Sequence, residues 1–167
     1  MPTLAGKRVL LIVSGGIAAY KTLELIRRVR ERGGAVRCVL TRAGAKFVTP
    51  LSLAALSEDR VYDDLFSLTD ESEMGHIRLS READLLVVAP ASADILAKMA
   101  QGRADNLATT VLLATDKPVL AAPAMNVRMW THAATQANLD ILKARGVVFV
   151  GPNEGDMACG EYGFGRM

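Results

Sequence analysis

The sequence predicts an α/β fold built on a doubly wound parallel sheet, and three observations support this. Apolar runs of strand length alternate with helix-like segments along the whole chain, which is the pattern of parallel sheets joined by helices. The runs are continuously apolar, as expected when helices cover both faces of a sheet. The 167 residues suffice for one domain with a full core and are too few for two. We therefore predict a single Rossmann-like domain.

The elements follow in order along the chain. The first strand, "RVLLIVS", leads into a helix that places Ala19, Leu23 and Ile26 on one face and ends at Gly33-Gly34. Residues 57–75 are polar and acidic, and we expect an irregular surface excursion there. The predicted strands are 8–14, 35–41, 84–90, 118–122 and 147–151, and the predicted helices are 17–32, 92–102, 105–115 and 131–146.

Composition narrows the function classes. The net charge of +2, from scattered Lys and Arg residues, argues against a nucleic-acid or anionic-membrane partner. No apolar run is long enough to cross a bilayer, and "VLLIV" is shorter than the hydrophobic region of a signal peptide. Only two cysteines are present, and Cys38 lies in the apolar run "AVRCVL". A reducing cytoplasm fits this usage better than a disulfide framework.

Ligands of such sheets bind beyond the carboxyl ends of the strands. At the first strand exit, "SGGIAAYK" puts Ser14, Gly15 and Gly16 before a helix. Helix-start amides and the positive end of the helix dipole favour an anion there, and Ser14 adds a hydroxyl donor. A tight turn with no ligand explains the same glycines. We expect a phosphate site.

A dinucleotide is a weaker interpretation of this exit. The glycine spacing is not G-x-G-x-x-G, and the second strand ends in Thr41-Arg42 where an acidic residue would hold an NAD ribose. Arg42 could meet the extra phosphate of NADP, so that option stays open. Thr41 offers a hydroxyl to a single phosphate, which favours a mononucleotide.

Two later strand exits carry polar side chains. In "APASAD", Ser92 can cap the next helix, and the small residues around it leave room for a flat heterocycle against the backbone. In "PAMNVRMW", Asn126 can likewise cap a helix. Both residues therefore have a structural and a ligand-binding interpretation.

Few side chains can do chemistry. His76 lies in a loop-like context, "EMGHIRL", whereas His132 begins a predicted helix, where a surface or capping role fits. Cys159 lies in residues 151–167, which hold five glycines and suggest a mobile flap. Its thiol can take part in a reaction, or Cys159 can be a passive exposed residue near a terminus. The two histidines and two cysteines are too far apart in sequence to suggest a metal site.

Together, the segments "SGGIAAYK", "GHI", "APASAD", "PAMNVRMW" and "ACGEYGFGRM" resemble the flavin-dependent cysteine decarboxylases, in order, from residue 6 to 167. Within that family they are most similar to the bacterial phosphopantothenoylcysteine decarboxylases. The resemblance implies the flavoprotein fold and FMN as cofactor. It also implies 4'-phospho-N-pantothenoylcysteine as substrate and 4'-phosphopantetheine as product, in coenzyme A biosynthesis.

The resemblance also assigns roles to residues. It implies catalysis by His76, Asn126 and Cys159, with substrate contacts from Asn126, Ala158 and Cys159. Oxidation of the substrate to a thioaldehyde lets the electrons of the departing carboxylate move onto sulfur, giving an enethiol. Asn126 would hold the carboxylate without a full positive charge, His76 would assist the oxidation, and Cys159 would protonate the enethiol. The implied FMN contacts are Ser14, Gly15, Gly16, Thr41, Phe47, Ser92, Asp94 and Met125.

The family further implies a homo-oligomer, either a trimer or a dodecamer built from trimers, with the flavin near subunit interfaces. Its bacterial members are commonly fused to a phosphopantothenoylcysteine synthetase. Here we expect residues 1–167 to form the decarboxylase domain alone, with 151–167 as a flap over the substrate and no ligase domain. Two rival functions remain, a peptidyl-cysteine decarboxylase of lantibiotic maturation and a non-catalytic FMN-binding regulatory protein.

Overall fold

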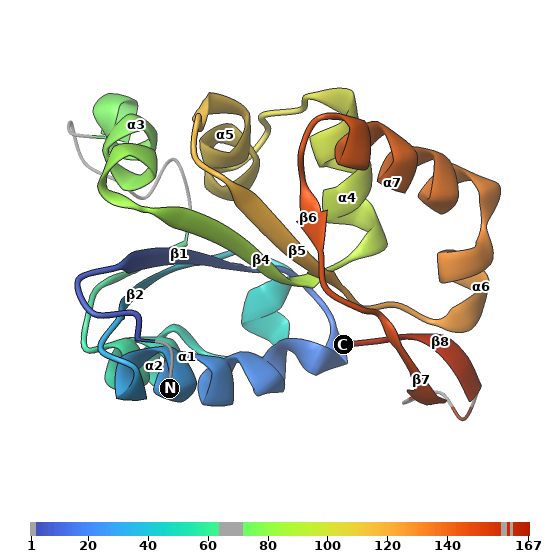
Figure 1. Ribbon diagram of the computed structural model, residues 1–167, viewed down its shortest axis with the longest axis horizontal. Helices are drawn as coiled ribbons and strands as arrows, with labels where there is room; N and C mark the ends of the chain where they lie inside the picture. The colour runs from blue at the N-terminus through green and yellow to red at the C-terminus, as the bar shows by residue number, and fades with distance from the viewer. Residues whose placement is uncertain (1–2, 64–71, 158–159, 161) are drawn as a thin grey trace.

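Six strands form one parallel sheet in the order β3-β2-β1-β4-β5-β6 (Figure 1). The computed structural model describes residues 3–63, 72–157, 160 and 162–167, with only the backbone of 72–74. The strands of this sheet are β1 Arg8–Val13, β2 Ala35–Leu40, β3 Val61–Tyr62, β4 Leu85–Ala91, β5 Val119–Pro123 and β6 Val148–Phe149. This order is that of a doubly wound sheet, so the predicted fold class is confirmed.

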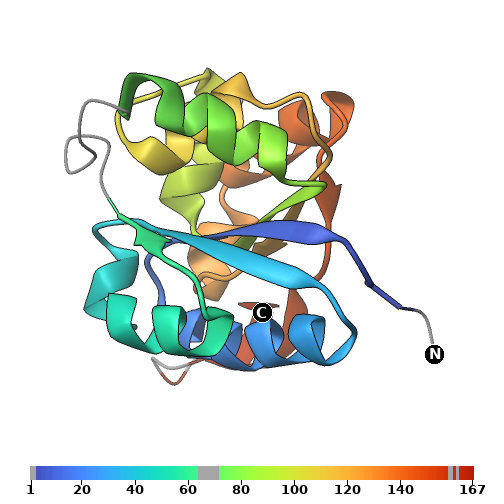
Figure 2. The same ribbon diagram turned by 90° about the vertical axis from the view of Figure 1, so that its left-hand side faces the viewer.

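Helices cover both faces of the sheet (Figures 1 and 2). One face carries α1 (Lys21–Glu31) and α2 (Pro50–Ser57), and the other carries α3 (Ser72–Glu82), α4 (Ala93–Gln101), α5 (Leu107–Ala114) and α7 (Ala133–Ala144). The short elements are the 3₁₀ helices η1 (Ile17–Tyr20) and η2 (Gly44–Lys46), the helix α6 (Val127–Thr131), and an antiparallel pair, β7 (Asn153–Asp156) and β8 (Tyr162–Arg166).

Alternate residues of the central strands enter two separate cores. On β1, Leu10 and Ile12 join the core beneath α3, α4, α5 and α7, while Leu11 and Val13 join the core above α1 and α2. Each of these four side chains is at most 1% exposed. Burial on both faces explains why the strands read as continuous apolar runs in the sequence.

Three segments differ from their predicted structure. Residues 57–75 are not irregular throughout, because β3 lies within this range and α3 begins at its end. His76 therefore lies in a helix and not in a loop. The C-terminal segment, from Asn153, forms the β7–β8 pair, which its high glycine content concealed.

None of the helices within the described ranges is long and apolar enough to cross a membrane. The apolar run around Cys38 predicts a buried strand thiol, and this is confirmed, since the thiol is free and 0% exposed.

We expect Cys38 to resist alkylation in the folded protein. Burial, assisted by the negative charge of Asp59, raises the pKa of Cys38 to about 12, so about one thiol in ten thousand is a thiolate at pH 8. Mass spectrometry after iodoacetamide treatment should find Cys38 labelled only in denaturant. Labelling at equal rates in the folded and unfolded chain would contradict this.

Candidate functional site

The strand order reverses between β1 and β4, and a side chain joins the ends of these two strands. The hydroxyl of Ser14, which is 2% exposed, donates to the carbonyl oxygen of Pro90. The hydroxyl oxygen of Ser14 in turn accepts from the backbone N–H of Ser92 at 3.0 Å. Ser14 therefore links the ends of β1 and β4 at the switch point of the sheet, which is the place where the strand order reverses. Its hydroxyl proton is already donated to Pro90.

The glycines after Ser14 let the backbone approach its neighbours closely. A Cβ at Gly15 would lie 2.6 Å from the Cβ of Ala43, so the exits of β1 and β2 touch where any side chain would clash. Gly16 precedes η1 and has no atom nearer than 3.9 Å to an added Cβ. This exit therefore presents bare backbone at the start of a helix, as a phosphate group requires.

A cavity of ≈ 650 Å³ opens beside this exit. Its size lies in the range of small-molecule and cofactor sites. Four segments supply its walls, namely the η1 region, the start of α4, residues 124–129 and the β7–β8 pair with the residues around it. Of the predicted FMN contacts, Gly15, Gly16, Ser92 and Met125 line it.

The other predicted FMN contacts lie elsewhere among the described residues. Thr41 is buried, and its hydroxyl oxygen accepts from the N–H of Gly44 at 3.0 Å. Phe47 is 47% exposed. Asp94 is exposed on the first turn of α4, with its carboxylate 3.3 Å from Lys98. These three, and Ser14 as well, do not line the cavity formed by the described chain.

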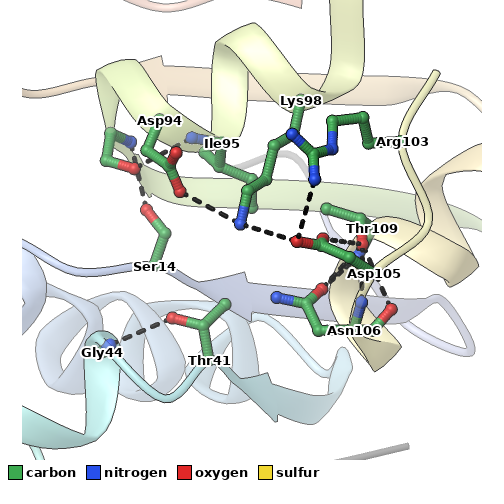
Figure 3. Close-up of polar contacts among 11 residues, drawn as sticks. Ser14, Thr41, Gly44, Asp94, Ile95, Lys98, Arg103, Asp105, Asn106 and Thr109 are labelled. Carbon is green, nitrogen blue, oxygen red and sulfur yellow. Dashed lines mark hydrogen bonds and ion pairs between the residues drawn. The ribbon is translucent and has the colours of Figure 1, made fainter. Parts of the chain in front are cut away.

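Lys98 ties the start of α4 to the connection that leads into α5 (Figure 3). Its ammonium group lies 3.3 Å from Asp94 and 3.2 Å from Asp105. Burial lowers the pKa of Lys98, but its bonds to the two carboxylates outweigh burial and raise it. The bond from Lys98 lowers the pKa of Asp105. Asp105 immediately precedes Asn106, which caps α5, so the ion pairs brace the helix that Ser92 begins.

Ser92 and Asn126 both cap helices, as their positions predict. The Ser92 hydroxyl accepts from the N–H of Ile95 at 3.1 Å. The side-chain amide oxygen of Asn126, Oδ1, accepts from the N–H of Met129 at 2.8 Å. This bond leaves the NH₂ group of Asn126 without a partner among the described residues, in a side chain that lines the cavity. One amide thus starts α6 and keeps two donors for a ligand.

Two cations line the cavity that the sequence did not single out. Lys21, at the start of α1, donates to the carbonyl oxygen of Met167. Arg166 lies on β8 and is exposed. The position of Lys21 directly after "SGGIAAY" was a usable signal for an anion site. Nothing in the sequence pairs Arg166 with that exit, because β8 approaches it only through the tertiary fold.

The described chain does not bring His76 to this cavity. His76 is on α3, which lies at the opposite end of the molecule from α6 and β8 (Figure 1). It is half-buried, and its Nδ1 is buried with no hydrogen-bond partner among the described residues. Cys159 and Ala158 fall outside the described residues. His132 caps α7 through Nδ1, as predicted, at 3.0 Å from the N–H of Ala134.

Comparison with known proteins decides the family. The model of the Flavoprotein family matches residues 2–167. The chain belongs to this family. It is 52% identical, over 165 residues, to the coenzyme A biosynthesis bifunctional protein CoaBC of Escherichia coli strain K12. The alignment covers 99% of this chain and 41% of that relative. The chain thus spans about two fifths of the length of this longer relative.

Solved structures of the family agree with the fold. A cysteine-to-serine variant of PPC decarboxylase, complexed with pantothenoylaminoethenethiol, is 38% identical with a TM-score of 0.83, and the match covers 96% of this chain and 90% of that one. SpaF, an FMN-dependent cysteine decarboxylase, is 31% identical with a TM-score of 0.84 and coverage of 96% and 91%. The fold of this chain is therefore that of solved FMN-dependent cysteine decarboxylases.

Gly165 joins β8 to the Asn126 segment, and we expect Gly165→Ala to be strongly destabilising. Gly165 has φ 138°, its carbonyl accepts from the N–H of Met125 at 2.8 Å, and an added Cβ would lie 2.0 Å from the Met125 carbonyl oxygen. A loss of about 3 kcal/mol of unfolding free energy is expected.

Gly146→Ala is the matched control. Gly146 has φ 93° and no atom within 4 Å of an added Cβ. Only its left-handed backbone conformation should therefore destabilise the variant, by about 1 kcal/mol of unfolding free energy. Urea unfolding measures both variants. Equal losses would show that β8 does not dock on Met125 as described.

Proposed function

We propose that this chain binds FMN and catalyses the oxidative decarboxylation of 4'-phospho-N-pantothenoylcysteine to 4'-phosphopantetheine. The observation that carries the proposal is the Asn126 amide, whose NH₂ group has no partner among the described residues and which lines a cofactor-sized cavity at the switch point. The 38% identical PPC decarboxylase, with its bound enethiol compound, supports this choice of reaction. The similarity to one part of the longer CoaBC protein supports a place in coenzyme A biosynthesis.

The cavity fits a flavin mononucleotide in size and in its donors. Gly15 and Gly16 would hold the phosphate with backbone N–H groups, and Ser92 and Met125 would lie against the ring. Thr41, Phe47 and Asp94 would join them only after a shift of their segments. When bound, FMN would accept two electrons from the substrate thiol carbon and later return them.

The chain's own residues would control charge and protons around the substrate. Asn126 would hold the carboxylate through its NH₂ group, which orients the anion without the strong ground-state stabilisation that a cation would give. His76 would take the proton released as the thiol is oxidised. Closure of residues 151–167 over the site would exclude water from the thioaldehyde.

The position of His76 supports a site shared between copies of the chain. Because α3 and the Asn126 cavity lie at opposite ends of one chain, His76 would reach the cavity of a second copy. Exposed apolar side chains support such an assembly, including Ile17, Tyr20 and Phe164, which are 59%, 56% and 52% exposed. A closed trimer, alone or within a dodecamer, satisfies every site with one head-to-tail interface.

Cys159 is proposed as the proton donor of the last step, and Cys159→Ser should separate that step from decarboxylation. A serine hydroxyl is far less acidic than a thiol, so CO₂ should leave while the enethiol accumulates. Liquid chromatography with mass spectrometry should detect a product two hydrogens short of phosphopantetheine. A normal yield of phosphopantetheine would remove Cys159 from the mechanism.

The cations favour a phosphorylated substrate over a peptide. Lys21 and Arg166 line the same cavity as Asn126 and supply two positive charges for a second anionic group. A peptide ending in cysteine, the substrate of the rival reaction, has no phosphate group for these two cations to bind. CO₂ release should be at least about a hundredfold faster with 4'-phospho-N-pantothenoylcysteine than with a peptide ending in cysteine. The reverse preference would favour the peptide reaction.

The remaining proposals concern partners and place. A phosphopantothenoylcysteine synthetase, fused or separate, would supply the substrate, as the length and name of the CoaBC relative suggest. The cytoplasm fits this pathway and the free thiol of Cys38. Residues 1–167 would act as the decarboxylase domain, with 151–167 as its flap.

A further inference from the structure

Methionines gather at the proposed active-site cavity. The chain has seven methionines, and four of them line this one cavity, namely Met125, Met129, Met157 and Met167. They come from separate segments, since Met125 and Met129 flank the start of α6 while Met157 follows β7 and Met167 follows β8. Thioethers are soft groups that oxidants convert to polar sulfoxides.

The four side chains differ in how much they are exposed. Met125 and Met167 pack against the two apolar cores. Met157 is half-buried, and its methyl carbon lies 3.4 Å from where a Cβ on Gly165 would be. Met129 is 44% exposed. Since oxidation follows access to the sulfur, Met129 is the member of this group that an oxidant in solution reaches first.

We propose that Met129 is a site of reversible sulfoxidation that weakens substrate binding. Hydrogen peroxide is the oxidant. The Met129 sulfur attacks one peroxide oxygen, the O–O bond breaks, an S–O bond forms and water leaves. The sulfur is oxidised by two electrons and the peroxide is reduced to water. A methionine sulfoxide reductase reverses the change.

Met129 is positioned to pass this change to the substrate holder. Its backbone N–H donates to the side-chain oxygen Oδ1 of Asn126 at 2.8 Å, which links the two residues at the start of α6. A sulfoxide oxygen on Met129 is a strong acceptor in the same cavity as the Asn126 amide, whose NH₂ has no partner among the described residues. It would compete for that NH₂ and repel a substrate carboxylate.

The source of the oxidant rests on the proposed function. A reduced flavin that meets oxygen produces peroxide, and in this chain it would do so inside the methionine-lined cavity. Sulfoxidation itself does not depend on that source, because added peroxide reaches the same sulfur. The experiment therefore uses added hydrogen peroxide on the FMN-loaded chain.

The first measurement maps the sulfoxides. Peptide mass spectrometry over a time course should find Met129 oxidised about tenfold faster than Met99, a half-buried methionine that lines a different cavity beside α5 and α7. Treatment with both methionine sulfoxide reductases should return Met129 to the thioether. Oxidation of Met129 no faster than that of Met99 would overturn the proposal.

The second measurement is kcat/KM before and after peroxide treatment. Each protein is compared with its own untreated sample. Oxidised thiols are first reduced with dithiothreitol. In the unaltered protein and in Met99→Leu, peroxide should lower kcat/KM about tenfold, mostly by raising KM, and treatment with the reductases should restore it. Met129→Leu should lose little. An equal loss in Met129→Leu would overturn the proposal. Failure of the proposed function would instead appear as absent turnover in the untreated protein, and the sulfoxide map would still decide whether Met129 is the modified residue.

Discussion

Asn126→Asp should abolish turnover while FMN stays bound. The substitution replaces an NH₂ group, which has no partner among the described residues, with a carboxylate oxygen in the wall of the cavity. Two negative charges about 4 Å apart cost about 4 kcal/mol at the effective dielectric of a protein surface. We therefore expect kcat/KM to fall about a thousandfold.

The same substitution should leave the fold intact. Asp caps helices as well as Asn does, and its oxygen can accept from the N–H of Met129 as the Asn126 oxygen does now. Absorbance near the flavin bands should report unchanged FMN content. The temperature of thermal unfolding should shift little, because the cap is the only hydrogen bond that this side chain makes among the described residues.

Asn126→Ser is the matched control for charge. Serine also caps helices, so this variant removes the NH₂ group and adds no charge. Its kcat/KM should fall by about tenfold, the value of one hydrogen bond to a charged group. A decrease in Asn126→Asp no larger than in Asn126→Ser would contradict the carboxylate-holding role.

Two inactive variants should restore activity when they share an oligomer. His76→Asn should block oxidation of the substrate, so that the flavin keeps its absorbance when substrate is added. Asn126→Asp should block the same turnover because its carboxylate repels the carboxylate of the substrate. Because α3 is remote from the cavity of its own chain, each complete site would draw on two chains.

Co-expression of the two variants with different tags tests this sharing. In a head-to-tail trimer that contains both variants, about one site in three pairs an intact His76 with an intact Asn126. Doubly purified mixed trimers should therefore recover about a third of the original activity, while each variant alone stays inactive. Mixed oligomers as inactive as their parents would mean that both residues serve the same chain's site.

Sequence patterns predicted the central sheet because burial on both faces leaves continuous apolar runs. The run 8–14 appears as β1, Arg8–Val13, with four of its side chains at most 1% exposed. The helix α3 escaped prediction because polar and acidic residues precede it and its apolar stripe is short, with Leu79 entering the core and Ala83 following the last residue of the helix. The β7–β8 pair escaped because its strands pair only with each other and carry Gly155, Gly163 and Gly165.

The candidate site was predictable at strand exits and not beyond them. Gly16, Ser92 and Asn126 follow strands of one parallel sheet, so topology alone brings them to one cavity. Arg166 reaches the same cavity on β8, a contact that no local pattern encodes. The distance of His76 from Asn126 also depends on tertiary structure, because His76 lies on α3 and not at a strand exit.

The central claim is that FMN bound in the switch-point cavity makes CO₂ leave a phosphorylated cysteine amide. The most direct test measures CO₂ released from 4'-phospho-N-pantothenoylcysteine, without oxygen, by the chain stripped of flavin and by the same sample reloaded with FMN. We expect no release from the stripped chain, and from the reloaded chain one CO₂ for each phosphopantetheine formed. Equal release with and without FMN, or a chain that takes up no FMN, would contradict the account.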